Sequence, residues 1–202
     1  MRIAFLGTPD FAVPSLQMLI DKGYELALFT NPDRPKGRKG ELTPPPTKEL
    51  AQKYDIPVYQ FEKIRCEEGV AALKEFAPDL MVTAAFGQIL SAENLAIPRY
   101  GCINVHGSLL PKLRGAAPIQ WSIINGDKIT GVTTMLTDVG LDTGDMLLKR
   151  ETEIGENETA GELFDRLAVM GAELLDETIQ ALVAGKLTPV PQDHEAATRC
   201  GM

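Results

Sequence analysis

Two polar side chains close a short apolar run in the middle of the sequence. Asn104 and His106 end the segment 103–106, which has the pattern of a central β-strand. Because strand side chains alternate, both point to one side while Val105 points to the other. An unpaired buried polar group costs about 1–3 kcal/mol, so this amide and imidazole indicate either a satisfied structural histidine or a catalytic pair. His194 lies in a polar tail, which leaves His106 as the candidate imidazole acid or base.

A carboxylate in a glycine-punctuated turn is the third candidate. Asp142 lies in the segment 138–144 between two predicted strands, where its Asp-Thr-Gly sequence also favours an ordinary Asx turn. If the turn lies over the strand ends, Asp142 meets His106 and favours the imidazolium. Asn104 and His106 can then donate hydrogen bonds to the oxyanion of a tetrahedral intermediate, while Asp142 orients the imidazole and accepts a proton. No serine or cysteine with a neighbouring base is evident, so these residue types favour direct acyl transfer to an amine.

The composition limits the class of protein. A chain of 202 residues with 44% hydrophobic content suits one globular domain. The formal net charge of −8 means that any nucleic-acid partner must meet a local basic patch. The cysteines (Cys66, Cys102 and Cys200) have no metal-type spacing, so we expect reduced thiols, no metal and a cytoplasmic location. No apolar run is long enough to span a bilayer, and no membrane partner is expected.

The order of the predicted elements indicates an α/β fold. Residues 3–6 predict a buried strand, residues 11–22 a helix and residues 25–30 a second strand, which together make a βαβ unit. Further strands are predicted over residues 56–59, 79–85, 101–106, 129–137 and 145–153, and further helices over 47–54, 66–76, 116–125 and 159–184. Thr159 and Glu162 form a capping box at the start of the last helix. This rhythm predicts a doubly wound, mostly parallel sheet with helices on both faces and an antiparallel hairpin at one edge.

A basic segment interrupts this pattern after the second strand. Residues 31–46 are rich in proline and glycine and contain Arg34, Lys36, Arg38 and Lys39, which predicts a long mobile loop. On an acidic protein such a loop is either a local attractor of phosphate or an ordinary solvated segment.

Five motifs, taken in order, resemble those of the methionyl-tRNA formyltransferase family. They are Phe5-Leu-Gly-Thr-Pro-Asp-Phe11, Asn31-Pro-Asp-Arg-Pro-Lys-Gly-Arg38, Ile103-Asn-Val-His-Gly-Ser-Leu-Leu-Pro111, Arg114-Gly-Ala-Ala-Pro-Ile-Gln120 and Asp138-Val-Gly-Leu-Asp-Thr-Gly-Asp-Met146. The resemblance implies a Rossmann-like formyltransferase domain that uses 10-formyltetrahydrofolate as its co-substrate. The catalytic Asn, His and Asp of the family correspond to Asn104, His106 and Asp142.

The resemblance also implies a folate pocket and a substrate. The folate pocket corresponds to Phe86, Gly87, Ile89, Leu90, Ser108, Leu109, Leu110, Pro111 and Asp138. An apolar loop beside a catalytic strand end is a surface on which a pterin ring can pack. The basic loop, with Arg34, Lys36, Gly37, Arg38 and Lys39, corresponds to the loop that inserts at the acceptor end of initiator methionyl-tRNA. A monomer is expected.

The domain boundary that we predict lies near residue 190. Residues 1–190 form the expected formyltransferase catalytic domain, and residues 191–202 form a tail or linker toward a C-terminal domain. In the family that the chain resembles, this second domain is a β-barrel that helps to hold tRNA.

Two other functions stay open. The chain could be a formyltransferase that acts on an amino-sugar nucleotide or on glycinamide ribonucleotide, although the first strand is not followed by a glycine-rich phosphate turn. It could also be a non-catalytic module that binds folate or RNA.

Overall fold

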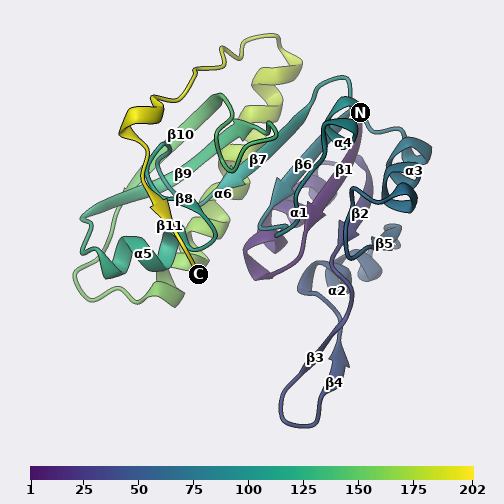
Figure 1. Ribbon diagram of the computed structural model, residues 1–202, viewed down its shortest axis with the longest axis horizontal. Coiled ribbons are helices and arrows are strands. Elements are labelled where there is room, and N and C mark those ends of the chain that lie inside the picture. The colour runs from purple at the N-terminus through teal and green to yellow at the C-terminus, as the bar shows by residue number, and fades with distance from the viewer. The chain divides into compact units, whose positions relative to one another are not determined.

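The computed structural model describes all 202 residues, which form two compact units (Figure 1). The units are Met1–Cys102 and Ile103–Met202. The first unit carries the predicted basic loop, and the second carries Asn104, His106 and Asp142.

Four parallel strands form the centre of the first unit. They are β1 (Arg2–Gly7), β2 (Glu25–Thr30), β5 (Val58–Gln60) and β6 (Leu80–Ala84), paired in the order β6-β1-β2-β5. Phe5 of β1 lies opposite Leu28 of β2 and Val82 of β6, and all three side chains are fully buried. Near-continuous apolar runs of this kind are what strands covered on both faces require.

Helices cover both faces of these strands. The helical elements are η1 (Asp10–Ala12), α1 (Val13–Asp21), α2 (Pro46–Lys53), α3 (Glu67–Phe76) and α4 (Ala92–Ala96). On one face, Leu73 and Phe76 of α3 join Phe29 in a core cluster. Phe5 and Leu28 alternate with the residues of that cluster and point to the other face, where α1 and α2 pack together and α2 contacts β2. This is the doubly wound, parallel arrangement that the sequence predicts.

The segment predicted as an irregular loop is a β-hairpin. Its strands are β3 (Arg34–Lys36) and β4 (Glu41–Thr43), which pair antiparallel and extend away from the rest of the first unit (Figure 1). The prediction of a loop was wrong, because the glycines lie at the tip and do not interrupt the two short strands. Gly37 and Gly40 in fact form the tip, where positive φ angles of 74° and 63° allow a tight turn between short strands.

The second unit contains an antiparallel arrangement of strands. Its strand β9 (Ile129–Leu136) lies between β7 (Cys102–His106) and β10 (Met146–Glu153), antiparallel to both. The long helix α6 (Ala160–Val183) packs on β9 and β10, and α5 (Pro118–Ile124) contacts α6. The antiparallel pairing of β9 with β10, predicted from the sequence, is therefore confirmed.

Some short elements carry too weak a pattern to be predicted. They are β8 (Arg114–Gly115), β11 (Arg199–Cys200) and the 3₁₀ turn η2 (His194–Ala196), together with α4 in the first unit. β8 and β11 pair in parallel, although they lie far apart in the sequence. Two-residue strands show no periodicity, because periodicity needs several residues to appear.

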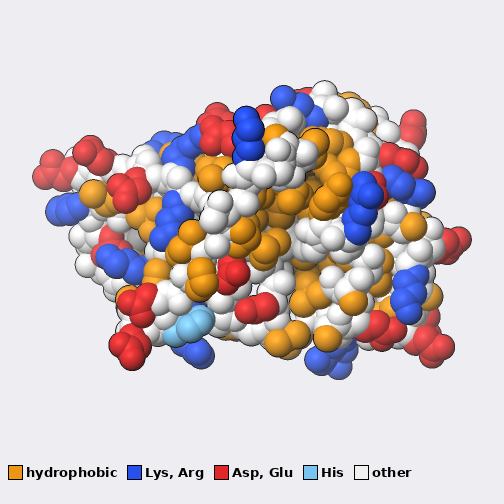
Figure 2. Space-filling view, turned by 90° about the horizontal axis from the view of Figure 1, so that it is seen from above, with side chains coloured by type: hydrophobic (Ala, Val, Ile, Leu, Met, Phe, Trp, Pro, Cys, Tyr) orange, Lys and Arg blue, Asp and Glu red, His pale blue; other side chains and the backbone are white.

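Charged side chains of both signs are mixed on one face of the molecule (Figure 2). On the face drawn in Figure 2, acidic and basic side chains lie among exposed hydrophobic ones, so the negative net charge is not gathered into one patch there. No helix of the chain combines the length and apolar character that crossing a bilayer requires.

The end of α3 provides a test of local stability. Ala77 terminates this helix in the left-handed region with a φ of 53°, and its N–H donates to the Leu73 carbonyl at 3.0 Å. Because a Cβ disfavours this conformation, Ala77→Gly should raise the free energy of unfolding by about 0.5–1 kcal/mol. Ala71→Gly, at an exposed position inside the same helix, should lower it by about 1 kcal/mol. Chemical denaturation measures both changes, and an equal loss in the two variants would contradict the left-handed cap.

Candidate active site

Asn104 and His106 lie on the same side of β7, as strand alternation predicts. Asn104 pairs with Met135 of β9 and His106 pairs with Thr133. His106 is the last residue of the strand and is only 6% exposed, whereas Asn104 is half-buried. The strand therefore brings an amide and an imidazole to one end of the unit with a fixed spacing.

The His106 ring has a protein group at each nitrogen. Its Nε2 lies 2.8 Å from the Leu113 carbonyl oxygen, and its Nδ1 lies 3.7 Å from Oδ2 of Asp142. Because a carbonyl oxygen can only accept, Nε2 carries a proton and donates. The other nitrogen, Nδ1, then faces the carboxylate, and its separation of 3.7 Å exceeds a hydrogen bond. Nδ1 is consequently the ring nitrogen that is positioned to exchange a proton near Asp142.

Asp142 reaches this position from the connection between β9 and β10. Its backbone has a φ of 54°, which is uncommon for a residue with a side chain. Oδ2 accepts a hydrogen bond of 2.8 Å from the Gly115 N–H, and the side chain is 13% exposed. A non-glycine residue with a positive φ is strained, so surrounding contacts must hold it in that conformation. Such residues are often found at functional sites. Here the Gly115 N–H orients the carboxylate toward the imidazole.

The Asx turn in this connection is made by Asp138 rather than by Asp142. Oδ1 of Asp138 accepts hydrogen bonds from the Gly140 N–H at 2.9 Å and from the Thr143 hydroxyl at 2.6 Å. The turn expected at the Asp-Thr-Gly sequence is therefore formed by the carboxylate of Asp138, four residues earlier in the chain. The carboxylate of Asp142 points instead to Gly115 and His106.

The loop that follows β7 is held from one side by Thr133. The Thr133 hydroxyl donates to the Ser108 carbonyl at 2.7 Å and accepts from the Leu110 N–H at 3.2 Å. Leu109 packs over Gly131, where an added Cβ would lie 2.7 Å from a methyl group of Leu109. The apolar loop of residues 108–111 thus has a defined conformation.

A lysine on β10 holds the same loop from another direction. Lys149 Nζ donates to the Leu110 carbonyl. Burial lowers the pKa of Lys149, and the nearby Glu151 carboxylate partly offsets this effect. A cation and a buried hydroxyl therefore fix the loop that contains Ser108, Leu109, Leu110 and Pro111.

The other predicted folate residues lie in the first unit. Phe86 and Leu90 are core side chains, 6% and 7% exposed, and Gly87 has a φ of 76°. The Phe86 carbonyl accepts a hydrogen bond of 2.9 Å from the Asn31 side chain. Ile89 is 66% exposed, so among these residues it offers the accessible apolar side chain.

The cations of the hairpin fall into two groups. Arg34 forms two hydrogen bonds of 2.8 and 2.7 Å with the Glu62 carboxylate, which lowers the pKa of that carboxyl. Lys36, Arg38 and Lys39 are exposed at and beside the tip. The positive charge that an anionic ligand would meet is concentrated at the tip, because Arg34 is already paired.

Two buried polar residues beside the site had no role in the sequence-based prediction. Arg114 and Gln192 are 4% and 5% exposed. Arg114 donates to Oε1 of Gln192, and Nε2 of Gln192 donates to the carbonyl oxygens of Asp142 and Gly144. Arg114 lies in one of the motifs, but Gln192 lies in a polar segment without periodicity, so only its contacts reveal it.

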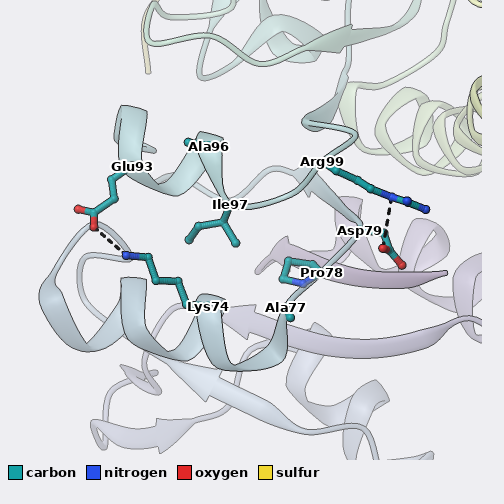
Figure 3. A pocket seen from close by; sticks show the side chains of 8 residues that line it. All are labelled: Lys74, Ala77, Pro78, Asp79, Glu93, Ala96, Ile97 and Arg99. Atoms are coloured by element: carbon teal, nitrogen blue, oxygen red, sulfur yellow. Dashed lines mark hydrogen bonds and ion pairs between the residues drawn. The ribbon is translucent and has the colours of Figure 1, made fainter.

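A depression elsewhere in the first unit has no such chemistry. It lies between α3 and the segment that includes α4, has a volume of about 490 Å³ and is lined by the residues labelled in Figure 3. Its charged side chains are paired, Lys74 with Glu93 at 3.2 Å and Arg99 with Asp79 at 3.6 Å. None of the predicted site residues lines it. The chain also shows no cluster of three or more His, Cys, Asp or Glu side chains arranged as metal ligands.

Comparison with known proteins identifies relatives of this chain. A family model described as formyl transferase matches residues 1–179. The chain is 57% identical to a methionyl-tRNA formyltransferase of Acetivibrio thermocellus, over 100% of this chain and 65% of that protein. The chain thus spans less than two thirds of the length of that relative.

Solved structures of formyltransferases have the same fold. A phosphoribosylglycinamide formyltransferase from Bacillus halodurans is 25% identical with a TM-score of 0.75, covering 91% of this chain and 96% of that chain. An N-formyltransferase from Helicobacter canadensis, in complex with folinic acid and dTDP-3-aminofucose, is 20% identical with a TM-score of 0.73, covering 98% of this chain and 70% of that chain. The predicted α/β formyltransferase fold is confirmed.

The contacts of Thr133 lead to a prediction about the loop of residues 108–111. Thr133→Val leaves the Ser108 carbonyl and the Leu110 N–H without their buried partner, so the free energy of unfolding should fall by about 2–4 kcal/mol. Thr130→Val, at a buried position on the same strand, should lower the free energy of unfolding by clearly less. Denaturation gives both values, and amide hydrogen exchange should become faster at Leu110 in Thr133→Val alone. Equal losses in the two variants would show that the loop does not depend on this hydroxyl.

Proposed function

The chain belongs to the formyl transferase family, and from this membership we propose that it transfers a formyl group from 10-formyltetrahydrofolate to the amino group of initiator methionyl-tRNA. The observation that carries the proposal is the pair formed by His106 and Asp142, with 3.7 Å between Nδ1 and Oδ2. His106 lies at the end of β7, the strand that also carries Asn104. The acceptor is inferred from the 57% identity to a methionyl-tRNA formyltransferase.

The proposed reaction is a direct transfer between two amines. The methionyl amine attacks the formyl carbon and forms a C–N bond, and the C–N10 bond of the folate breaks as the intermediate collapses. The Asn104 amide and the protonated Nδ1 of His106 donate to the oxyanion of that intermediate. Asp142 accepts the proton lost by the amine, directly or through one water molecule, and N10 takes up a proton as tetrahydrofolate leaves.

The formyl donor is proposed to lie against the apolar loop that follows β7. The residues assigned to it are Phe86, Gly87, Ile89, Leu90, Ser108, Leu109, Leu110, Pro111 and Asp138. The Thr137 hydroxyl, next to Asp138, is buried without a hydrogen-bond partner, and an orphaned hydroxyl suits a ligand with polar ring atoms. The folate relation is also supported by the Helicobacter canadensis protein, which is in complex with folinic acid. When bound, the co-substrate supplies the activated formyl group.

The proposal extends to the cellular setting. We assign the reaction to the cytoplasm, in keeping with three cysteines that are all free thiols. We assign it to a monomer, since Asn104, His106 and Asp142 all come from one unit of one chain.

The central prediction concerns the carboxylate of Asp142. Asp142→Asn keeps an oxygen that can accept from the Gly115 N–H but removes the proton acceptor, so kcat should fall about 10²- to 10⁴-fold. The affinity for a non-reactive folate analogue, measured by calorimetry, should be unchanged. Asp127→Asn, at an exposed turn, removes the same charge and should leave both quantities unchanged. An Asp142→Asn variant with the kcat of the wild type would rule out the proposed role.

The acceptor is tested with a panel of amines and one formyl donor. The panel contains methionyl-tRNA, glycinamide ribonucleotide and an amino-sugar nucleotide, and transfer should occur to methionyl-tRNA. Transfer to another member alone would overturn the proposed acceptor. Folate binding without transfer to any amine would instead favour a non-catalytic binding module.

The hairpin tip is proposed to bind the acceptor end of tRNA. Lys36, Arg38 and Lys39 are exposed there, on a chain with a net charge of −8, so the tip is a local attractor of phosphate. Arg34 is assigned a different part, because its ion pair with Glu62 joins the hairpin to the body of the first unit.

Neutralising the tip gives a salt-dependent prediction. Replacing Lys36, Arg38 and Lys39 with alanine should weaken tRNA binding and reduce the slope of log K against log salt by about 2, since about 0.7 counterions are released per contact with a single strand. The control replaces three other exposed lysines, Lys53, Lys63 and Lys128, and makes the same change in charge. Filter binding at several salt concentrations measures both slopes. An equal change in the control would indicate unspecific attraction.

A further inference from the structure

The last residues of the chain contact the segments that hold His106 and Asp142. Residues 192–200, named here the C-terminal strap, lie beyond the residues 1–179 that the family model matches. The strap includes β11, which pairs with β8, so that Cys200 lies opposite Gly115. Sequence alone predicted a tail for this segment, and no part of the proposed reaction uses it.

One end of the strap holds the connection that carries Asp142. Both polar atoms of the Gln192 amide are used there. Its Oε1 accepts from Nε and Nη2 of Arg114 at 3.0 and 2.8 Å, and its Nε2 donates to the Asp142 and Gly144 carbonyls at 2.9 and 2.7 Å. The side chain is 5% exposed. Glutamine is suited to this position, because a carboxylate would keep the acceptor for Arg114 but lose both donors.

The other end of the strap holds the partner of the imidazole. The Thr198 hydroxyl accepts a hydrogen bond of 2.8 Å from the Leu113 N–H, and the Thr198 carbonyl accepts one of 2.9 Å from the Arg114 N–H. Leu113 supplies the carbonyl oxygen to which Nε2 of His106 donates. Thr198 is therefore linked to the His106 ring through a single residue, Leu113.

At its last residue, Cys200, the strap lies against Gly115, whose N–H is the backbone donor to the Asp142 carboxylate. The Gly115 N–H donates to Oδ2 of Asp142. A Cβ at residue 115 would lie 2.2 Å from the Cys200 carbonyl oxygen, and the φ of Gly115 is 120°, so only glycine permits this approach. The strap consequently supports Leu113, Gly115 and the Asp142 backbone together.

We propose that the C-terminal strap sets the separation between His106 and Asp142, with Gln192 and Thr198 as positioning residues for formyl transfer. The kinetic part of this inference rests on the proposed function, whereas the geometric part does not. Displacing a reacting group by about 1 Å can cost about 10²-fold in rate, so a segment that fixes both groups controls kcat more than affinity.

The first experiment replaces Gln192 in the full 202-residue chain. Gln192→Glu keeps the acceptor for Arg114 and removes the donors to the Asp142 connection, and Gln180→Glu, at an exposed position on α6, makes the same change as a control. The ring nitrogens are followed by ¹⁵N NMR. The chain has only two histidines, and correlation of each ring with its own backbone amide separates their signals. His194 itself is left unchanged, because its Nδ1 lies 2.9 Å from Nη2 of Arg114. Gln192→Glu should shift the Nδ1 signal of His106, and Gln180→Glu should not.

The second experiment addresses the other end of the strap. Thr198→Val removes the acceptor for the Leu113 N–H, and Thr188→Val, at an exposed position, is its control. The Nε2 signal of His106 should shift in Thr198→Val. In both strap variants kcat should fall about 10- to 100-fold with the KM for the formyl donor unchanged. Thermal unfolding shows whether each variant is folded at the assay temperature. If one of the two strap variants is not folded, the other one tests whether the strap positions the site.

The two readouts separate the failure of this inference from the failure of the proposed function. If the wild type transfers no formyl group, the proposed function fails, and the ring signals alone decide whether the strap positions the site. Unshifted signals in the folded strap variants would overturn the inference. In an active enzyme, shifted signals with an unchanged kcat would also overturn it, as would a lower kcat with unshifted signals.

Discussion

The candidate site in the second unit is built around a buried imidazole that faces a carboxylate from beyond hydrogen-bonding distance. Nε2 of His106 is committed to a backbone carbonyl, and Nδ1 lies 3.7 Å from Asp142. A buried polar group that loses its hydrogen-bond partner costs free energy, so both side chains need partners in the protein. Each partner is accordingly fixed by backbone groups, the Leu113 carbonyl for the ring and the Gly115 N–H for the carboxylate.

The parts of the fold that were predictable are those with long apolar patterns. β1, β2 and β6 are buried on both faces and appear in the sequence as nearly uniform apolar runs. The segment 31–46 was not predictable in the same way, because its short hairpin strands are exposed and contain proline. The long-range pairing of β8 with β11 could not be predicted either, since parallel pairing of two-residue strands leaves no local signal in the sequence.

The candidate site was predictable in its residue types but not in its distances. Strand alternation predicted that Asn104 and His106 share a side, because that follows from β geometry alone. The position of Asp142 depends on a left-handed residue and on the close approach of Gly115, and neither can be derived from a turn sequence. The same local sequence contained two aspartates, and only the contacts distinguish the turn-forming Asp138 from the one that faces the imidazole.

Arg114 supports the connection that carries Asp142 without bonding to the Asp142 carboxylate itself. A guanidinium bonded directly to the Asp142 carboxylate would stabilise the anion and weaken it as a proton acceptor. In the structure the cation contacts the neutral amide of Gln192, and that amide contacts the backbone of the Asp142 connection. The carboxylate itself receives a backbone N–H, which orients it with a partial charge only. The network therefore holds the backbone of the Asp142 connection in place without setting a cation against the carboxylate.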